Sequence, residues 1–593
     1  MSNESARLAG ANPSERSLWL NPRRWAVFVA VMALFCLVFS QLSGSEPAAL
    51  QGKPLGHWTS VLPPLMAVVV ALCFHSLVWA LSSAFVLGAL LAFWPHAAMA
   101  LPWGFRDFIW VNFQEQFNLY IFAFLFALVG MVHVIHRSGG LHGLIGALSK
   151  VARGPRSTKF ATMLAGGAIF FDDYSNTVVV GSTMRNLCDR WKVSREKLSY
   201  LVDATSAPVA GVAPLSTWIA FEVFLLGEAA LAMGMKEGGY EIFLNMLPFR
   251  FYCWGTILFC LLTSVMGRDF GPMFRAERRA AIEGKVLRDG AKLLTRETGV
   301  GSEPIPGKPQ RWINAVLPLA VVILGTLGGI VLLGRHKILA GGAAFSFQSA
   351  ADWRNAFGMV TNPAITPGGA MKVLFIASVC SGVLAVGLAT SQRILTFRQS
   401  MSAYARAVPT MWMALFILVM AWGMSKICTR GLHTDTYLVS LLGERLPLPF
   451  LPLAIFLLGA GISFATGTSF GTMAILIPTM FPLAHAMGAY QPENQTIFWL
   501  ASAAILDGAI FGDHCSPISD TTVLSSISSQ CDLVDHVKTQ LPYAMFTMLV
   551  ASAAYVAVAF GMPAWGFCLA SPLASLAVLM LVGRRVPAPA AAS

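Results

Sequence analysis

The sequence predicts an all-α polytopic membrane protein with two inverted repeats, each with a re-entrant hairpin and an interrupted helix, and about 12 spans in total. Three observations predict this class: apolar segments along the whole chain, very few charges, and an order of segments that recurs in the two halves. Of the 593 residues, 56% are hydrophobic and only 12% are charged, and the mean hydropathy is +0.65. Soluble domains carry roughly 25% charged residues, so the composition excludes a soluble globular protein.

The net charge of +12 lies mainly in short connections beside apolar segments. Cytoplasmic loops carry such an excess of Lys and Arg, so we interpret the charge as a topology signal and not as a nucleic-acid-binding surface. Arg23 and Arg24 place the N-terminus in the cytoplasm, and Arg584 and Arg585 place the C-terminus there. The ten cysteines form no CxxC pair or other metal-ligand spacing, so we interpret them as small core residues.

Charge and hydropathy together order the spans. In the first half we expect spans at 25–44, two within 58–97, and one each at 117–136, 199–225 and 242–266. In the second half we expect spans at 312–334, 371–391, 408–428, 497–523, 540–561 and 564–582. No cleavage site follows the first segment, which predicts a retained span and not a signal peptide.

The apolar segment 160–184 differs from the others because basic connections flank it on both sides. A single spanning helix cannot begin and end on the same side of a membrane, so we expect a re-entrant hairpin with "DDYSNT" (172–177) at its tip. Each arm of about ten to twelve residues is roughly 15–18 Å long at 1.5 Å per residue. This is half of a hydrocarbon core of roughly 30 Å, so the tip is expected near the midplane.

A second polar interruption, "FATGTSFGTM" (464–473), divides the apolar segment 447–484 in the other half of the chain. "STM" (182–184) corresponds to "PTM" (478–480), and 200–218 corresponds loosely to 504–522. Each unit of three spans, a hairpin and two further spans crosses the membrane an odd number of times, so the second unit is expected upside down. Inverted repeats whose interrupted helices meet near the midplane are typical of secondary transporters.

These features divide the chain into six parts. We expect a cytoplasmic N-terminal arm (1–24), an added first span with its outer loop (25–57), a first inverted repeat (58–267), a cytoplasmic basic linker (268–311), a second inverted repeat (312–562), and a last span with the C-terminal tail (563–593).

Four groups of polar side chains are expected at membrane depth, at the hairpin tips and in the interrupted spans. A carboxylate at this depth is costly unless it is paired, hydrated or bound to a cation. Hydroxyl, amide, carbonyl and carboxylate oxygens suit a hard cation such as Na⁺. The predicted cation- and proton-binding residues are Asp172, Asp173, Ser175, Asn176, Thr177, Asp203, Thr205, Ser206, Thr466, Gly467, Thr468, Ser469, Thr472, Asp507, Asp513, Ser516, Ser519, Asp520 and Thr521.

Several of these carboxylates have a structural alternative. Either Asp172 or Asp173 could instead cap the second hairpin arm, because Asp is a preferred N-cap residue. Asp203 and Asp507 lie near the start of interrupted spans and could instead accept hydrogen bonds from backbone amides. The sequence leaves these alternatives open.

The polar residues around 513–520, and Glu222 in the first half, leave further alternatives. Asp513 and Asp520 share one face only if the segment is helical, and Pro517 is expected to break it. His514 beside Cys515 is too small a set for a metal site, so packing or a hydrogen bond is the preferred interpretation. Glu222 lies towards the outer end of its span, where water could solvate it.

Four segments carry a resemblance to a known family. "FFDDYSNTVVVGSTMR" (170–185), "LSYLVDATSAPVAGVAPLSTW" (198–218), "TGTSFGTM" (466–473) and above all "GAIFGDHCSPISDTTVLSS" (508–526) resemble the signatures of NhaC-type sodium/proton antiporters of the ion-transporter superfamily. The resemblance covers roughly residues 120–560. It implies hairpin-tipped inverted repeats and exchange of external H⁺ for internal Na⁺ or Li⁺ across a bacterial inner membrane.

The resemblance also has limits. Ser175-Asn176-Thr177 is similar to the hairpin-tip triplet of dicarboxylate/sodium symporters, and the family includes members that exchange organic acids or amino acids. Phe470 stands where the family pattern has Trp, and Asp507 stands where it has a small residue.

We therefore predict a Na⁺/H⁺ antiporter that exchanges cytoplasmic Na⁺, or Li⁺, for external protons by alternating access. It is expected to need no cofactor besides the transported ions, and to interact with the lipid bilayer and small cations but not with nucleic acid; a small organic solute and a homodimer are compatible with the sequence. The alternative is a Na⁺- or H⁺-coupled carrier of an organic acid or amino acid, whose carboxylate would bind freed helix N-termini. An enzyme is not expected, because the sequence shows no HExxH motif or base–nucleophile pair.

Overall fold

The computed structural model describes residues 57–74, 77–114, 116–293, 304–361, 365–366, 369–406, 409, 412–442 and 445–587. The predicted N-terminal arm and the predicted span 25–44 lie outside these residues. The described part is mostly helical. Its only strands are the two-residue strands β1 (Arg268–Asp269) and β2 (Arg584–Arg585), which pair in antiparallel fashion.

The helices follow the order of apolar segments in the sequence. Those of the first half are α3 (Leu62–Phe74), α4 (Leu77–Ala92), α5 (Ala97–Gly104), α6 (Gln116–Arg137), α7 (Gly140–Leu148), α8 (Pro155–Ala168), α9 (Asp173–Arg190), α10 (Arg195–Ala204), α11 (Ala207–Ala210), α12 (Thr217–Ala232), α13 (Gly239–Met246), α14 (Phe251–Met266) and α15 (Gly271–Glu283). Those of the second half are α16 (Ile313–Ala340), α17 (Ala350–Thr361), α18 (Gly369–Ser391), α19 (Phe397–Ala405), α21 (Trp412–Lys426), α22 (Thr434–Leu442), α23 (Leu451–Thr466), α24 (Ser469–Ala486), α25 (Gln495–Cys515), α26 (Asp520–Ser529), α27 (Leu533–Ala559) and α28 (Gly566–Leu581).

The length and hydropathy of these helices confirm a polytopic helical membrane protein. Seven helices of the described part are long and apolar enough to cross a membrane, and two bent helix pairs raise the number to nine. The span count of about 12 stays a prediction. Several expected spans, among them α21 and α28, have only 15 and 16 helical residues.

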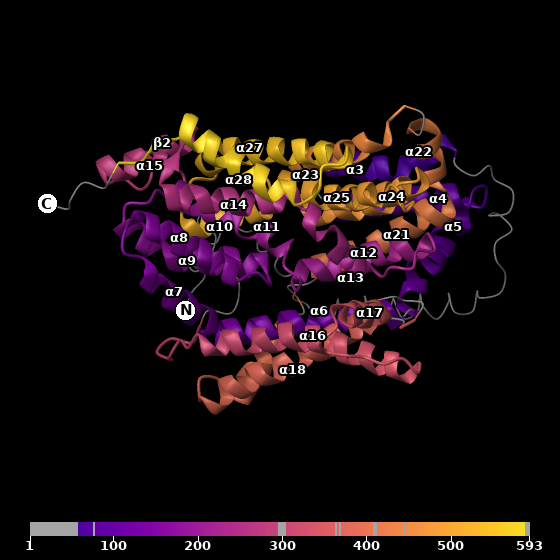
Figure 1. Ribbon diagram of the computed structural model, residues 1–593, viewed down its shortest axis with the longest axis horizontal. Coiled ribbons are helices and arrows are strands. Elements are labelled where there is room, and N and C mark those ends of the chain that lie inside the picture. The colour runs from indigo at the N-terminus through magenta and orange to yellow at the C-terminus, as the bar shows by residue number, and fades with distance from the viewer. Residues whose placement is uncertain are drawn as a thin grey trace, which may run out of the picture.

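The helices form two layers (Figure 1). The long helices α6, α16 and α18 pack together as one layer with α17 beside them, and most of the other helices form a thicker layer above it, with α27 and α28 along its far edge. Helices α8 and α9 lie towards the end of the molecule that carries α15 and β2, whereas α24 lies towards the opposite end with α22. The two polar-tipped segments therefore point into the molecule from opposite ends.

Both predicted interruptions are breaks between two helices. Helix α8 ends at Ala168, and Asp172 begins α9 as an N-cap whose Oδ2 accepts a hydrogen bond from the Ser175 N–H at 2.8 Å. Helix α23 ends before Gly467, which has a φ of +69°, and the Thr468 hydroxyl then caps α24 by accepting from the Gly471 N–H at 3.3 Å. A left-handed residue followed by a capped helix start is an inexpensive way to turn the chain.

Two predicted spans are also broken. The segment 199–225 forms α10, the short α11 and α12, with Pro208 and Pro214 near the breaks. The segment 497–523 forms α25 and α26, and the break between them contains Pro517. Proline lacks the amide hydrogen that continues a helix. Pro208 lies in the first turn of α11, whereas Pro214 and Pro517 lie in the connections that follow α11 and α25. The linker 268–311 contains the helix α15, and the loop 335–370 contains α17, a helix that the sequence pattern did not predict.

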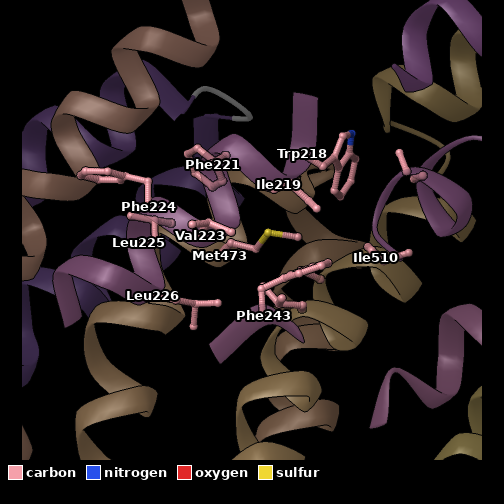
Figure 2. Close-up of a cluster of buried hydrophobic side chains, with 14 of the residues drawn as sticks. Trp218, Ile219, Phe221, Val223, Phe224, Leu225, Leu226, Phe243, Met473 and Ile510 are labelled. Carbon is pink, nitrogen blue, oxygen red and sulfur yellow. The ribbon is translucent and has the colours of Figure 1, made fainter. Parts of the chain in front are cut away.

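An apolar cluster holds α24 against α12 (Figure 2). Trp218 and Ile219 of α12 and Met473 of α24 are buried there, together with Phe243 and Ile510 from α13 and α25. This packing fixes the start of α24 beside the break that precedes α12.

Candidate cation-binding site

The first hairpin tip, residues 169–172, touches both broken helices. The Phe171 carbonyl accepts a hydrogen bond from the Thr217 N–H at 2.9 Å, at the start of α12. The Tyr174 hydroxyl donates to Asp520 Oδ2, at the start of α26. The tip and the first turn of α9 therefore contact a segment more than 300 positions away in the sequence.

The second hairpin tip, residues 467–468, also meets both breaks. A Cβ on Gly467 would lie 2.9 Å from the backbone carbon and oxygen of Ile518, between α25 and α26. The Phe470 ring packs 4.8 Å from the ring of Trp218 and 4.9 Å from that of Phe221, both in α12. Both tips and both breaks thus converge on one region.

The adjacent aspartates of the first tip have different roles. Asp172 is half-buried and caps α9 through Oδ2, while its Oδ1 lies 3.4 Å from the Thr217 hydroxyl. Asp173 is 2% exposed, and its Oδ2 has no hydrogen-bond partner among the described residues. Asp172 is therefore the capping residue, and Asp173 holds a carboxylate oxygen free for a ligand.

Asp513, in the last turn of α25, is surrounded by hydroxyl groups. Its Oδ2 accepts from the Ser469 hydroxyl at 2.9 Å, and its Oδ1 accepts from the Ser519 hydroxyl at 2.7 Å. The Ser519 hydroxyl also lies 2.9 Å from that of Thr521 and caps α26. These donors are neutral, so they orient the buried carboxylate without neutralising its charge.

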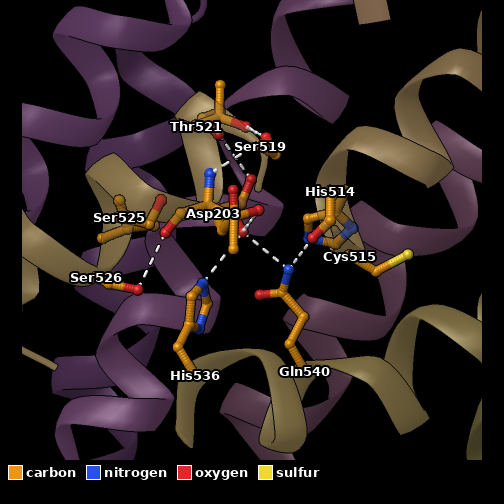
Figure 3. Close-up of polar contacts among 12 residues, drawn as sticks. Asp203, His514, Cys515, Ser519, Thr521, Ser525, Ser526, His536 and Gln540 are labelled. Carbon is orange, nitrogen blue, oxygen red and sulfur yellow. Dashed lines mark hydrogen bonds and ion pairs between the residues drawn. The ribbon is translucent and has the colours of Figure 1, made fainter. Parts of the chain in front are cut away.

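Asp203, in the last turn of α10, lies at the centre of a polar cluster (Figure 3). Its Oδ2 accepts from Gln540 Nε2 at 2.8 Å and from the Thr522 hydroxyl at 3.2 Å, and His536 Nε2 lies 3.2 Å away. Gln540 also donates to the His514 carbonyl. Asp203 is fully buried, and its Oδ1 has no partner in the described part of the chain.

Sequence reasoning missed His536 and Gln540. They lie four residues apart on α27 and therefore on the same helix face. That spacing was the available signal, but residue 536 precedes the predicted start of the span at 540.

Asp520 lies at the exposed edge of the cluster. Tyr174, Pro517, Ile518 and Asp520 are exposed there. Asp520 interacts electrostatically with the carboxylates of Asp173, Asp513 and Asp203. Within the described ranges, no Lys or Arg forms an ion pair with any of these four carboxylates.

The remaining predicted residues lie at the tips and breaks. Asn176 donates to the carbonyls of Gly166, Ile169 and Thr205, and its Oδ1 has no partner among the residues described. The hydroxyls of Thr177, Thr205, Ser206, Thr466, Thr472 and Ser516 each donate to a backbone carbonyl. Their oxygens keep lone pairs that a cation can use. Ser175 takes part through its backbone N–H, which donates to the N-cap Asp172.

Asp507 is the exception, and its predicted role as a cation ligand needs correction. Its Oδ1 accepts from Arg250 Nε at 2.9 Å, and its Oδ2 accepts from the Tyr252 N–H at 2.7 Å and the Tyr555 hydroxyl at 3.0 Å. Arg250 Nη1 also lies 3.5 Å from Glu222 Oε2. The Asp507 charge is thus already compensated by a buried arginine, and Glu222 belongs to the same ion-pair group and is 0% exposed, not solvated.

The type of ion that such a cluster could hold follows from its atoms. Within the described ranges, no three His, Cys, Asp or Glu side chains stand close enough together to hold a metal ion. A ligand set would therefore combine one or two carboxylates with hydroxyl, amide and carbonyl oxygens, which is oxygen chemistry suited to a hard ion.

Comparison with known proteins supports this description. Residues 209–560, more than half of the chain, match the model of the Na⁺/H⁺ antiporter family. An uncharacterized protein of Haemophilus influenzae is 29% identical over 530 residues, 89% of this chain and 95% of its own length. The malate-2H⁺/Na⁺-lactate antiporter of Bacillus subtilis is 36% identical over 118 residues, 19% of this chain and 24% of that protein. The arginine/ornithine antiporter ArcD of Halobacterium salinarum is 27% identical over 257 residues, 42% of each chain.

Two solved structures share the fold. The YdaH transporter of Alcanivorax borkumensis has a TM-score of 0.52 at 18% identity, covering 85% of this chain and 99% of its own. MtrF of Neisseria gonorrhoeae, from a class of antimetabolite efflux pumps, has a TM-score of 0.51 at 15% identity, covering 86% and 97%.

The apolar helices, the fold and the relatives together define a multi-pass membrane secondary transporter. The family match is the more specific result. The chain belongs to the Na⁺/H⁺ antiporter family, as the four sequence motifs predicted.

Proposed function

We propose that this protein exchanges cytoplasmic Na⁺, or Li⁺, for external protons at the cluster formed by Asp173, Asp203, Asp513 and Asp520. One observation carries the proposal: four carboxylates meet at the hairpin tips and helix breaks, and no Lys or Arg of the described residues pairs with them. Uncompensated carboxylates inside a membrane protein are unfavourable, and a bound cation or proton relieves that cost.

The free oxygens support a site that alternates between the two ions. Asp173 Oδ2, Asn176 Oδ1 and Asp203 Oδ1 are buried and lack partners in the described part. A bound cation favours the ionised carboxylate, and its departure from a buried site favours protonation. Competition of Na⁺ and H⁺ for the same oxygens gives antiport when the site opens to one side at a time. No cofactor is needed for this cycle.

We further propose that 58–267 and 312–562 are inverted repeats, joined by the linker 268–311. The N-caps Asp172 and Thr468 have similar backbone angles, with φ of −157° and −151° and ψ of 118° and 122°. "STM" and "PTM" begin at the same distance from the starts of α9 and α24. The opposite directions of approach in Figure 1 agree with this arrangement.

The alignment of 200–218 with 504–522, which pairs Asp203 with Asp507, also needs to be shifted. Asp203 is the second-last residue of α10, so by distance from the break it corresponds to His514 or Asp513 and not to Asp507. On the basis of the basic flanks, we also propose that both termini lie in the cytoplasm of a bacterial cell and that the protein lies in the inner membrane.

A second candidate is exchange of a small organic acid or amino acid coupled to Na⁺ or H⁺. Two relatives favour it, since one is a malate-2H⁺/Na⁺-lactate antiporter and the other an arginine/ornithine antiporter. The starts of α9, α24 and α26 converge at the cluster, and helix N-termini can bind a carboxylate.

Proton flux in proteoliposomes distinguishes the two candidates. With Na⁺ inside and Na⁺-free buffer outside, the proposed exchange acidifies the lumen, and choline in place of Na⁺ does not. The assay is repeated with malate, lactate, arginine and ornithine. Acidification that appears only with an organic solute would contradict Na⁺/H⁺ exchange and support the second candidate.

A further inference from the structure

A basic cavity lies at the end of the molecule opposite α22, away from the carboxylate cluster. Its volume is about 640 Å³, within the roughly 300–1,000 Å³ of small-molecule sites. The start of α8, the turn after α9, the linker helix α15 and the residues following β2 form its walls. Four segments distant in sequence therefore contribute to one cavity.

The lining carries an excess of positive charge. Its basic residues are Arg153, Arg156, Lys159, Lys192 and Arg585, and its acidic residue is Glu277.

Internal contacts already occupy Glu277. It accepts from Lys159 Nζ at 2.9 Å and from the N–H and hydroxyl of Ser194 at 2.8 Å. The other four basic residues form no ion pair within the part of the chain that the structure describes. Glu277 is thus matched by Lys159, and the four other cations of the lining have no acidic partner among the described residues.

A buried ion network adjoins the cavity through Lys159, whose Nζ lies 4.0 Å from Asp269 Oδ2. Lys197 Nζ lies 2.8 Å from Asp269 Oδ1, and the Tyr543 hydroxyl donates to the same carboxylate at 2.7 Å. Burial would raise the pKa of Asp269, but the ammonium groups of Lys197 and Lys159 outweigh it and hold that pKa below its ordinary value. Asp269 Oδ1 is therefore bonded to Lys197 and Tyr543, and Asp269 Oδ2 lies beside Lys159 Nζ. The charge of Asp269 is thus balanced within this network and does not neutralise the other four basic residues of the lining.

The start of α8 adds backbone donors to the same cavity. Gly154, the N-cap, supplies no side-chain cap, and Gly154 to Ser157 line the cavity. Uncapped first-turn amides and the helix dipole favour an anion at this position. The amides thus reinforce the four cations.

We propose that this cavity binds a phosphate-bearing anion. Arginine side chains and helix N-terminal amides recognise phosphate oxygens, and basic pockets beside membrane-spanning helices bind anionic lipid headgroups. The anion joins the base of the first hairpin to the linker and to the C-terminal strand. It is separate from the transported ions, so the proposal does not rest on the proposed exchange.

The test measures the thermal unfolding midpoint of the purified full-length protein in detergent at constant ionic strength. The probes are inorganic phosphate, with chloride as the control, and phosphatidylglycerol, with phosphatidylcholine as the control. We expect a saturable rise in the midpoint. A rise with phosphatidylglycerol alone assigns the site to a lipid headgroup, and a rise with inorganic phosphate as well assigns it to a soluble phosphate.

The variant Arg153→Gln with Arg156→Gln removes two charges from the lining. Each basic residue contributes roughly 1 kcal/mol to the binding of an anionic headgroup. The concentration of probe that half-saturates the double variant is therefore expected to be about 30-fold higher than for the wild type. Arg275→Gln with Arg278→Gln is the matched control, since both residues are exposed on α15 and lie outside the lining. If the first variant does not fold, the single change Arg585→Gln at the exposed β2 is expected to give about a fivefold increase.

Two results would overturn the proposal. One is the absence of a saturable rise with either probe in the wild type. The other is an equal loss of response in the lining variant and in the control.

Discussion

Replacing Asp173 with Asn is expected to abolish coupled exchange while the protein remains folded. The change removes a buried, uncompensated carboxylate oxygen but keeps the size of the side chain. Loss of one charge from a buried charge pair costs about 3–5 kcal/mol, a factor of roughly 100 or more in ion affinity. Na⁺-dependent proton flux in proteoliposomes measures the effect.

The neighbouring residue provides the control. Asp172→Asn makes the same chemical change one position earlier, at an N-cap where Asn is as favourable as Asp. This variant is expected to keep most of the flux and its thermal stability. Equal loss of flux in both variants would contradict the assignment of Asp172 as the helix cap and Asp173 as the ion ligand.

Replacing Arg250 with Met is expected to have the largest effect on stability. Arg250 is fully buried between Asp507 and Glu222, and its removal leaves two carboxylates without a cation. Breaking such a group costs about 3–5 kcal/mol. We expect a lower thermal unfolding midpoint and a smaller monodisperse fraction in size-exclusion chromatography.

A compensating variant separates lost charge from lost packing. Combining Arg250→Met with Glu222→Gln and Asp507→Asn removes all three charges, so most of the stability is expected to return. Arg250→Met with wild-type stability, or a triple variant no more stable than the single one, would contradict the role assigned to this ion pair.

Much of the fold could be predicted because the relevant signals are local. Basic residues on both sides of 160–184 predicted an interruption, and the described helices break at residues 169–172. "TGTS" predicted the second break because Gly467 adopts the left-handed backbone and Thr468 caps the next helix. Pro517 likewise marked the end of α25. Such residues act on their own segment, so the sequence pattern reveals them.

The partners across the structure could not be predicted in the same way. Arg250 pairs with Asp507, 257 positions away, and nothing near either residue indicates the other. Asp203 likewise meets His536 and Gln540, 333 and 337 positions away. The sequence pattern therefore does not reveal that Arg250 neutralises Asp507, and it predicts Asp507 as a cation ligand. The capping role of Asp172 was one of two open alternatives, because either aspartate could precede the helix.

Proton release on Na⁺ binding tests the central claim most directly. Purified protein in lightly buffered detergent solution is titrated with NaCl, with choline chloride as the control, over a series of pH values. If Na⁺ and H⁺ compete for the carboxylate cluster, Na⁺ releases protons saturably, its apparent affinity falls as the pH is lowered, and Asp173→Asn abolishes the release. Na⁺ that releases no protons at any pH, or only when an organic solute is present, would contradict the account.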